Sequence, residues 1–298
     1  MKKIKVFSAL LLTIILLLTA IVSVNATTYY YSSGYELYSD ESGNGWIINS
    51  YAQNASEIII PDVLIEKSVT TIGGRSFEKR TELSKVVMPD TITTIGSYAF
   101  DDCSYLSNVS FSKNLQYIYA GAFRRCSSLG ELDLSETRLS LIGSAAFYSC
   151  NELQEVILPD TLETISGNAF ANCSNLNKIV IGRNVTSIAA SAFNNSPNTV
   201  IHCYYDSVAY QYAVEKGISY VLLDEIKLGD TDGDGYVNIN DVTHIQRHLA
   251  ELENLEGIYL HVADANQDGT LDISDATTLQ MYLAEYDIPY PIDEIMTQ

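Results

Sequence analysis

The sequence predicts an α/β repeat solenoid followed by a small all-α unit, and three observations lead to this prediction. Phenylalanine recurs every 23 or 24 residues through the middle of the chain. A short acidic segment occurs twice near the C-terminal end, at an offset of 34 residues. An apolar leader precedes both regions. The recurring residues are Phe77, Phe100, Phe123, Phe147, Phe170 and Phe193.

Residues 1–26 form the predicted signal peptide. Lys2, Lys3 and Lys5 precede an apolar run over residues 6–24, and small residues before Thr27 give a cleavage pattern. An uncleaved membrane anchor is the alternative, because such a run approaches the bilayer-spanning length of about 20 residues. No second apolar run of this length follows. We therefore expect a secreted, extracellular protein that has no membrane contact after cleavage.

The negative charge of the chain limits the classes of partner that it can bind. The net charge is −20, which disfavours nucleic acid and anionic membranes and favours cations. Residues 229–298 hold ten Asp and five Glu against Arg247 alone, a net charge of −14. This asymmetry predicts a boundary near Leu228. The four His residues form no cluster typical of a zinc site or a general base, so we expect no catalytic residues.

Residues 57–223 are predicted to form the solenoid and its C-terminal cap. In each repeat an alternation such as Val86-x-Met88 predicts a short strand, which Pro89 ends. An Ile-Gly-x-x-Ala-Phe segment then returns the chain, with the phenylalanine pointing inward. Residues 27–56 are expected to cap the front. A helix over residues 206–216 with Gly217 as its cap, and a strand over residues 218–223, are expected to close the far end.

The repeat closely resembles the leucine-rich repeats of bacterial BspA-like surface proteins over about residues 57–200. The shared pattern is a strand, Pro, Ile-Gly, Ala-Phe, Cys and Leu, as in Ile165, Ala169-Phe170, Cys173 and Leu176. The first repeat departs from it, with an arginine at the Cys position and an insertion between residues 61 and 72. The resemblance implies adhesion to an unknown protein or polysaccharide. A solvated spacer surface is the alternative.

Four cysteines occupy one position of the repeat. Because residues of the same phase in adjacent repeats point in parallel, we expect a ladder of buried thiols rather than disulfides. The sequence leaves the state of Cys203 open. The four residues are Cys103, Cys126, Cys150 and Cys173.

The duplicated acidic segment predicts two calcium loops. Oxygen ligands at loop positions 1, 3, 5, 9 and 12, a backbone carbonyl at position 7 and glycine at position 6 suit a cation of calcium's size. Solvated Asp-Gly turns are the alternative, but they would not repeat every ligand. The predicted ligands of the first ion are Asp230, Asp232, Asp234, Tyr236, Asn238 and Asp241. Those of the second are Asp264, Asn266, Asp268, Thr270, Asp272 and Asp275.

Residues 229–293 are predicted to form a separate domain after a linker over residues 224–228. Residues 229–288 closely resemble a type I dockerin of paired, EF-hand-like loop–helix units. The resemblance implies calcium-dependent binding to a cohesin domain of a scaffoldin in a cellulosome-type complex. Helices are expected over residues 239–251 and 273–285. Their inward stripes are predicted to be Val242, Ile245 and Leu249, and Ala276, Leu279 and Leu283.

A second stripe, turned about 90° from the first, is identical in the two copies. It comprises Ile239, Thr243, Gln246 and Ala250, and Ile273, Thr277, Gln280 and Ala284. Identity on this face suggests one partner surface for both copies. The dockerin resemblance adds further expected cohesin contacts, which are Asn240, Arg247, Ser274 and Met281.

Together these features predict a non-catalytic adhesion protein attached to an extracellular scaffold. The alternatives are a free secreted effector that acts on a host and an enzyme of polysaccharide breakdown. The enzyme needs paired carboxylates in a cleft. Glu131 and Asp133 are close in sequence but are expected to alternate along one open strand.

Overall fold

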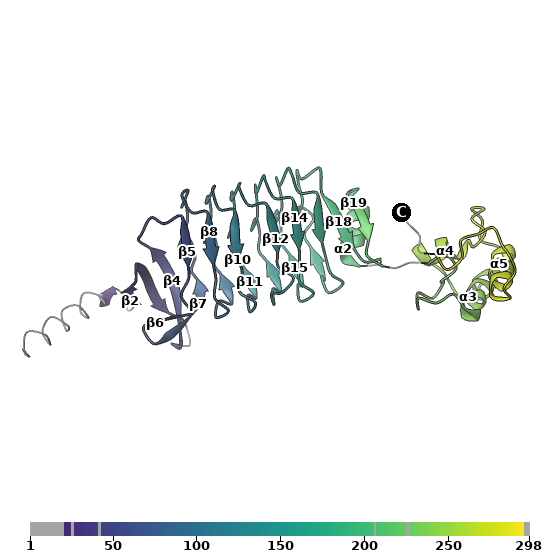
Figure 1. Cartoon of the computed structure of the whole chain (residues 1–298), viewed down its shortest axis with the longest axis horizontal. Coiled ribbons are helices and arrows are strands. Elements are labelled where there is room, and N and C mark those ends of the chain that lie inside the picture. The colour runs from purple at the N-terminus through teal and green to yellow at the C-terminus, as the bar shows by residue number, and fades with distance from the viewer. Residues whose placement is uncertain (1–20, 25–26, 41–42, 206, 225–226, 295–298) are drawn as a thin grey trace, which may run out of the picture. The chain divides into compact units, whose positions relative to one another are not determined.

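The computed structural model describes residues 21–24, 27–40, 43–205, 207–224 and 227–294 (Figure 1). The chain forms two compact units, Met1–Val221 and Leu222–Gln298. The first unit is a β-solenoid in which successive repeats stack side by side along the chain (Figure 1). The second unit is helical. The predicted fold class, a repeat solenoid followed by a small helical unit, is confirmed.

Each repeat contributes one strand to each of two faces of the solenoid. One face consists of strands of three or four residues in two sheets, in which successive repeats pair in parallel. The predicted inward positions, such as Val86 and Met88, are buried. The strands of this face are β5 (Glu57–Ile59), β8 (Lys85–Val87), β10 (Asn108–Ser110), β12 (Glu131–Asp133), β14 (Glu155–Ile157), β16 (Lys178–Val180), β18 (Val200–Cys203) and β19 (Ser219–Leu222).

The other face is made by the return segments, which are two-residue strands and turns within the repeats. They pair in parallel in one sheet that starts in the N-terminal cap. The insertion of the first repeat is a hairpin of β6 (Val63–Leu64) and β7 (Lys67–Ile72). The remaining strands are β9 (Thr94–Ile95), β11 (Tyr117–Ile118), β13 (Leu141–Ile142), β15 (Thr164–Ile165) and β17 (Ser187–Ile188).

The repeated phenylalanines form a continuous stack through the core, as predicted. Neighbouring rings lie 5.1–5.5 Å apart between centroids and within 9° of parallel. A tyrosine terminates the stack at each end, because Tyr51 packs on Phe77 and Tyr212 packs on Phe193. Both tyrosines lie outside the 23-residue period, so the sequence pattern did not reveal them.

The N-terminal cap is a meander of antiparallel strands. It contains β1 (Ile21–Val24), β2 (Thr27–Ser32), β3 (Tyr35–Ser39) and β4 (Gly45–Tyr51). Apart from β1, the predicted signal peptide lies outside the described residues. Arg80, at the Cys position of the first repeat, donates to the carbonyl oxygens of Tyr51 and Gln53 and so ties this repeat to the cap.

The C-terminal cap of the solenoid contains α2 (Val208–Lys216) and β19. The Ser207 hydroxyl accepts from the backbone N–H of Tyr210, and Gly217 ends the helix with a φ of 64°, which glycine adopts without strain. Asp206, the predicted start of this helix, lies outside the described residues.

The repeat cysteines are buried thiols, as predicted. Each donates to the carbonyl oxygen of the phenylalanine in the preceding repeat, as Cys126 Sγ does to Phe100 at 3.1 Å. Equivalent bonds join Cys103 to Phe77, Cys150 to Phe123 and Cys173 to Phe147, at 3.1–3.3 Å. In the last repeat Ser196 takes the same role toward Phe170 at 2.8 Å. Cys203 is also a buried thiol.

The helical unit contains α3 (Ile239–Leu249), α4 (Gly257–Ala263) and α5 (Ile273–Leu283). α3 and α5 begin where the sequence predicted and end two residues earlier, while α4 was not predicted. Val242, Ile245, Ala276 and Leu279 form the centre of its core. Among the described residues, no helix has the length and apolar character needed to cross a membrane.

Candidate metal centre and docking face

The first acidic loop folds around the carboxylate of Asp230. Its Oδ1 accepts from the backbone N–H of Gly233 at 2.8 Å, and its Oδ2 accepts from that of Gly235 at 2.9 Å. Gly235 has a φ of 87°, which gives the sharp turn expected at loop position 6. Carboxylate oxygens of Asp230, Asp232 and Asp234 lie within 4.8 Å of one another.

The last predicted ligand, Asp241, joins this loop to α3. Its carboxylate is fully buried and accepts from the backbone N–H groups of Thr231 at 2.7 Å and Asn238 at 2.7 Å. The second of these bonds is half of a capping box, in which the Asn238 side chain in turn accepts from the backbone N–H of Asp241. Asn238 Oδ1 also accepts from the N–H of Asn240 at 2.8 Å. The helix therefore begins inside the metal loop, as the sequence predicted.

The second loop repeats these contacts. Asp264 accepts from the N–H of Gly269 at 2.8 Å, and the buried Asp275 accepts from the N–H groups of Asn266 at 3.1 Å and Asp272 at 2.9 Å. Gly269 has a φ of 86°. Asp272 caps α5 through a capping box, as Asn238 caps α3. The duplication read from the sequence is thus also a duplication of backbone geometry.

Burial sets the electrostatics of both loops. Desolvation raises the pKa of Asp230 and of Asp275 above the usual carboxyl value, while hydrogen bonds from backbone N–H groups oppose this rise. Hydrogen bonds from Ser274 lower the pKa of the exposed Asp272. Among the described residues no lysine or arginine forms an ion pair with any of the predicted carboxylate ligands.

Two predicted ligands, Tyr236 and Thr270, are expected to bind the cation through their main-chain carbonyl oxygens. The side chain of Tyr236 is exposed, and its carbonyl oxygen accepts from the Asn238 amide at 3.2 Å. Thr270 is likewise exposed, and its N–H donates to Asp268 at 2.9 Å. An all-oxygen donor set with clustered carboxylates and no cationic side chain fits Ca²⁺, whose positive charge would offset that of the loop.

The two identical helix stripes are exposed. Ile239 and Ile273 are 61% and 62% exposed, although each is a large apolar residue at the start of a helix. The Thr243 hydroxyl donates to the Ile239 carbonyl at 2.9 Å, and Thr277 makes the same bond to Ile273 at 2.9 Å. The other residues of the stripes, Gln246, Ala250, Gln280 and Ala284, are exposed as well. The core of the unit therefore uses neither stripe.

Comparison with known proteins identifies the two units. Residues 47–151 and 70–200 match the model of the BspA type leucine-rich repeat region, in six copies. The chain belongs to this repeat family. Residues 228–284 match the dockerin type I domain. A search of curated proteins found no match.

Solved structures agree on the fold of the BspA-type array. A leucine-rich repeat protein of T. pallidum is 22% identical, with a TM-score of 0.54, and the match covers 63% of this chain and 95% of that protein. The pneumococcal vaccine antigen PcpA is 15% identical, with a TM-score of 0.51, over 69% of this chain and 50% of the antigen. At these identities the likeness extends to the solenoid fold alone.

The flanks of the dockerin stripes are also exposed and differ between copies. Arg247 Nε lies 2.9 Å from Glu253 Oε2, whereas its counterpart Met281 carries no charge and is 40% exposed. Asn240 and Ser274, the other expected contacts, are exposed at the starts of α3 and α5. The two halves of the dockerin thus present one shared stripe with different borders.

The prediction that Leu249 points into the core is wrong. Leu249 is 38% exposed, whereas its counterpart Leu283 packs partly against the dockerin core. Leu249 is the last residue of α3, and Glu251 then turns the chain with a φ of 58°. Leu249 is not among the described residues that form the core of the helical unit or pack against it.

Proposed function

We propose that this chain is a secreted, non-catalytic adhesion protein that is held on an extracellular scaffoldin. Its dockerin would bind a cohesin domain in a calcium-dependent manner, as part of a cellulosome-type complex. The BspA-type array would then display a binding surface on that scaffold. Its ligand would be a protein or a polysaccharide.

The exposed pair of stripes is the observation that carries this proposal. The dockerin exposes two large apolar residues, Ile239 and Ile273, in equivalent positions of the two identical stripes. Each is followed along the chain by the same three stripe residues, a threonine, a glutamine and an alanine. An apolar anchor with a polar border is typical of an interface that forms after folding.

Two calcium ions are proposed to hold the stripes in place. Each predicted metal loop ends on the first turn of its helix through Asp241 or Asp275, so loop geometry and helix start are coupled. Without a cation, the clustered carboxylates would repel one another and weaken that coupling. Calcium would therefore control cohesin binding through the fold of the dockerin.

The structure of the repeat array favours a role in displaying a binding surface over a catalytic role. Its repeated residues are used for the phenylalanine stack, the thiol ladder and the strands. Glu131 and Asp133 are both exposed on β12, where they alternate along an open strand. A glycosidase needs two carboxylates that face each other across a cleft, and this strand does not provide that arrangement.

The direct test is capture by cohesin. The full chain would be titrated, in calcium and in chelator, with each cohesin domain encoded in the genome of its source organism. We expect tight binding to at least one cohesin in calcium, loss of binding in chelator, and loss in the double variant Ile239→Asp, Ile273→Asp. Leu252→Asp is the matched control, because Leu252 is an exposed apolar residue of the same unit outside the stripes.

Failure of every cohesin to bind the calcium-loaded chain would contradict the proposal. Export has a separate test, which is the N-terminal sequence of the protein recovered from culture medium. We expect it to begin near Thr27, as the leader predicts.

A further inference from the structure

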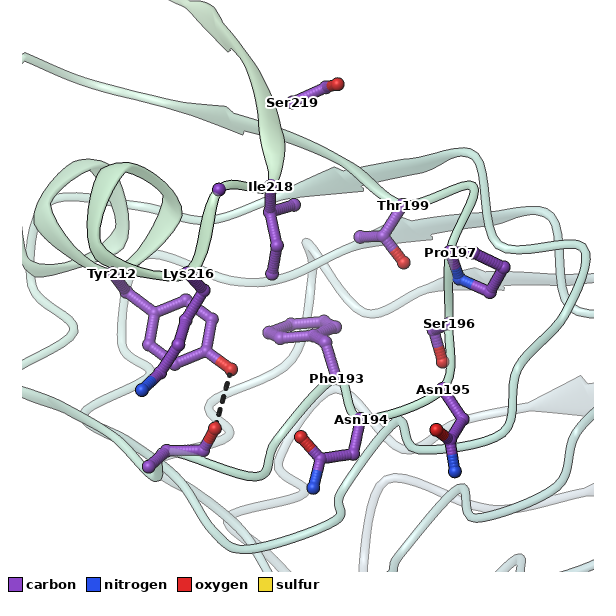
Figure 2. Close-up of a pocket in the computed structure, with 12 residues that line it drawn as sticks. Phe193, Asn194, Asn195, Ser196, Pro197, Thr199, Tyr212, Lys216, Ile218 and Ser219 are labelled. Carbon is purple, nitrogen blue, oxygen red and sulfur yellow. Dashed lines mark hydrogen bonds between the residues drawn. The ribbon is translucent and has the colours of Figure 1, made fainter.

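The last repeat of the array carries a pocket that the scaffold-binding function does not use. It has a volume of about 370 Å³ and lies between the final phenylalanine turn and the end of α2. Figure 2 shows Ile218 pointing toward the Phe193 ring, with Thr199 on the facing wall. Asn194, Asn195 and Ser219 also line it. All of these residues belong to the first compact unit.

Thr199 departs from the repeat in a way that the fold does not explain. The same position holds a fully buried leucine in the preceding repeats, at Leu83, Leu106, Leu129, Leu153 and Leu176. Thr199 is only 4% exposed, and among the described residues its hydroxyl has no hydrogen-bond partner. Native proteins rarely leave a buried hydroxyl unpaired, because this costs stability. The hydroxyl therefore lacks a partner in the protein, but its oxygen is almost closed to solvent, so a ligand would have to displace part of the pocket wall to bond to it.

The backbone offers a second unused group at this pocket. In five earlier repeats, the residue two positions after the phenylalanine has a positive φ, and its N–H donates to a carbonyl of the next repeat, as Asn172 does to Asn194 at 2.9 Å. Asn195 has the same conformation, with a φ of 58°. No repeat follows it, and its N–H has no acceptor among the described residues. The corresponding donors are Lys79, Asp102, Arg125, Ser149 and Asn172.

The chemistry of the lining indicates the class of ligand. Phe193 and Tyr212, which are only 4% and 7% exposed, give the pocket one aromatic side, while amides and hydroxyls provide neutral hydrogen-bonding groups. No Asp or Glu lines the pocket, although the chain has 37 of them. The one charged lining residue, Lys216, is paired with Glu215 at 2.9 Å. A flat, partly apolar molecule that carries many hydroxyls matches these groups.

We propose that this pocket binds the terminal sugar residue of a neutral polysaccharide. The Thr199 hydroxyl and the Asn195 N–H would bond to sugar hydroxyls, and the aromatic side would lie against the ring. This inference rests on the proposed display function and names the class of ligand that the array would take. The pocket is closed on one side by α2, so it fits a chain end better than the middle of a chain.

The test is a titration of the full, calcium-loaded chain with cellobiose, xylobiose, mannobiose and lactose at millimolar concentrations, followed by nuclear magnetic resonance. We expect saturable binding of at least one sugar. Thr199→Leu should weaken it at least about tenfold, because the substitution fills the pocket and removes the hydroxyl. This variant should fold at least as stably as the natural chain, since five other repeats carry leucine there.

Thr94→Leu is the matched control, because Leu141 occupies the equivalent position on β13, two strands away in the same sheet. It should leave sugar binding unchanged. Absence of saturable binding for all four sugars, or binding unaffected by Thr199→Leu, would overturn the proposal. The proposal would also be overturned if the chain bound a synthetic peptide of residues 164–176, which carries one phenylalanine turn, and bound none of the sugars. Cohesin binding by the Thr199→Leu chain reports separately on the scaffold function.

Discussion

Phe147 lies in the middle of the phenylalanine stack, between Phe123 and Phe170. We expect Phe147→Ala to lower the free energy of unfolding of the array by about 3–5 kcal/mol, because the cavity removes contacts to two neighbouring repeats. Chemical denaturation followed by circular dichroism measures this loss. Glu131→Ala, on an exposed strand position, is the control and should change little. Equal denaturation midpoints for the two variants would show that the stack does not stabilise the array.

The ladder thiols should be unreactive in the folded chain. Burial raises the pKa of Cys103 and of Cys173 to about 12, and it also raises the pKa of Cys126 and Cys150 well above the usual thiol value. At pH 8 a thiol with a pKa of about 12 is ionised in only about one molecule in ten thousand. We expect a disulfide reagent to label these four thiols only after denaturation. Rapid labelling of all four in the native chain would contradict the ladder.

At the residue level, the sequence predicted the positions that repeat and missed those that do not. The spacing identified the phenylalanines and the buried thiols, because each repeat imposes the same environment on the same position. Tyr51 and Tyr212, which end the stack, lie outside that spacing and are brought there by the caps. The unpaired hydroxyl of Thr199 required coordinates, because sequence alone does not show whether a buried polar group has a partner.

At the level of elements, the metal loops and their helices should form one calcium-dependent structure. In calorimetry of the full chain we expect two unfolding transitions, and chelator should shift only that of the helical unit to lower temperature. Asp230→Ala should weaken the response to calcium, since Asp230 organises the first loop. Asp287→Ala, at an exposed carboxylate outside both loops, should not. Magnesium should substitute poorly, because it demands a tighter octahedral shell. If chelator left both unfolding temperatures unchanged, the loops would not be metal sites.

The sequence located the starts of elements better than their ends. The first residues of α3 and α5 are fixed by caps that the loop motif contains, Asn238 and Asp272. Their last residues depend on Glu251 and Glu285, which adopt positive φ values that no local signal announces. The short helix α4 and the β6–β7 hairpin lie in segments without periodicity, so their form depends on the surrounding structure.

At the level of the whole molecule, the two compact units should behave independently. Phe147→Ala should lower the unfolding temperature of the array and leave the calcium-dependent transition where it is. The two units have separate cores, and distant, unconnected sites contribute additively to stability. A shift of both transitions by this one substitution would show that the units are energetically coupled.

The most direct test of the account is calorimetric titration of a cognate cohesin with the chain and its stripe variants. Since the stripes of α3 and α5 are identical, the dockerin is expected to dock through either one, in two alternative orientations. Replacing Ile239 or Ile273 alone by Asp should then weaken binding only about twofold, or about 0.4 kcal/mol. Replacing both should cost well over about 2 kcal/mol. Loss of all binding in one single variant whose calcium-loaded fold remains intact would contradict the account and leave one helix as the sole contact.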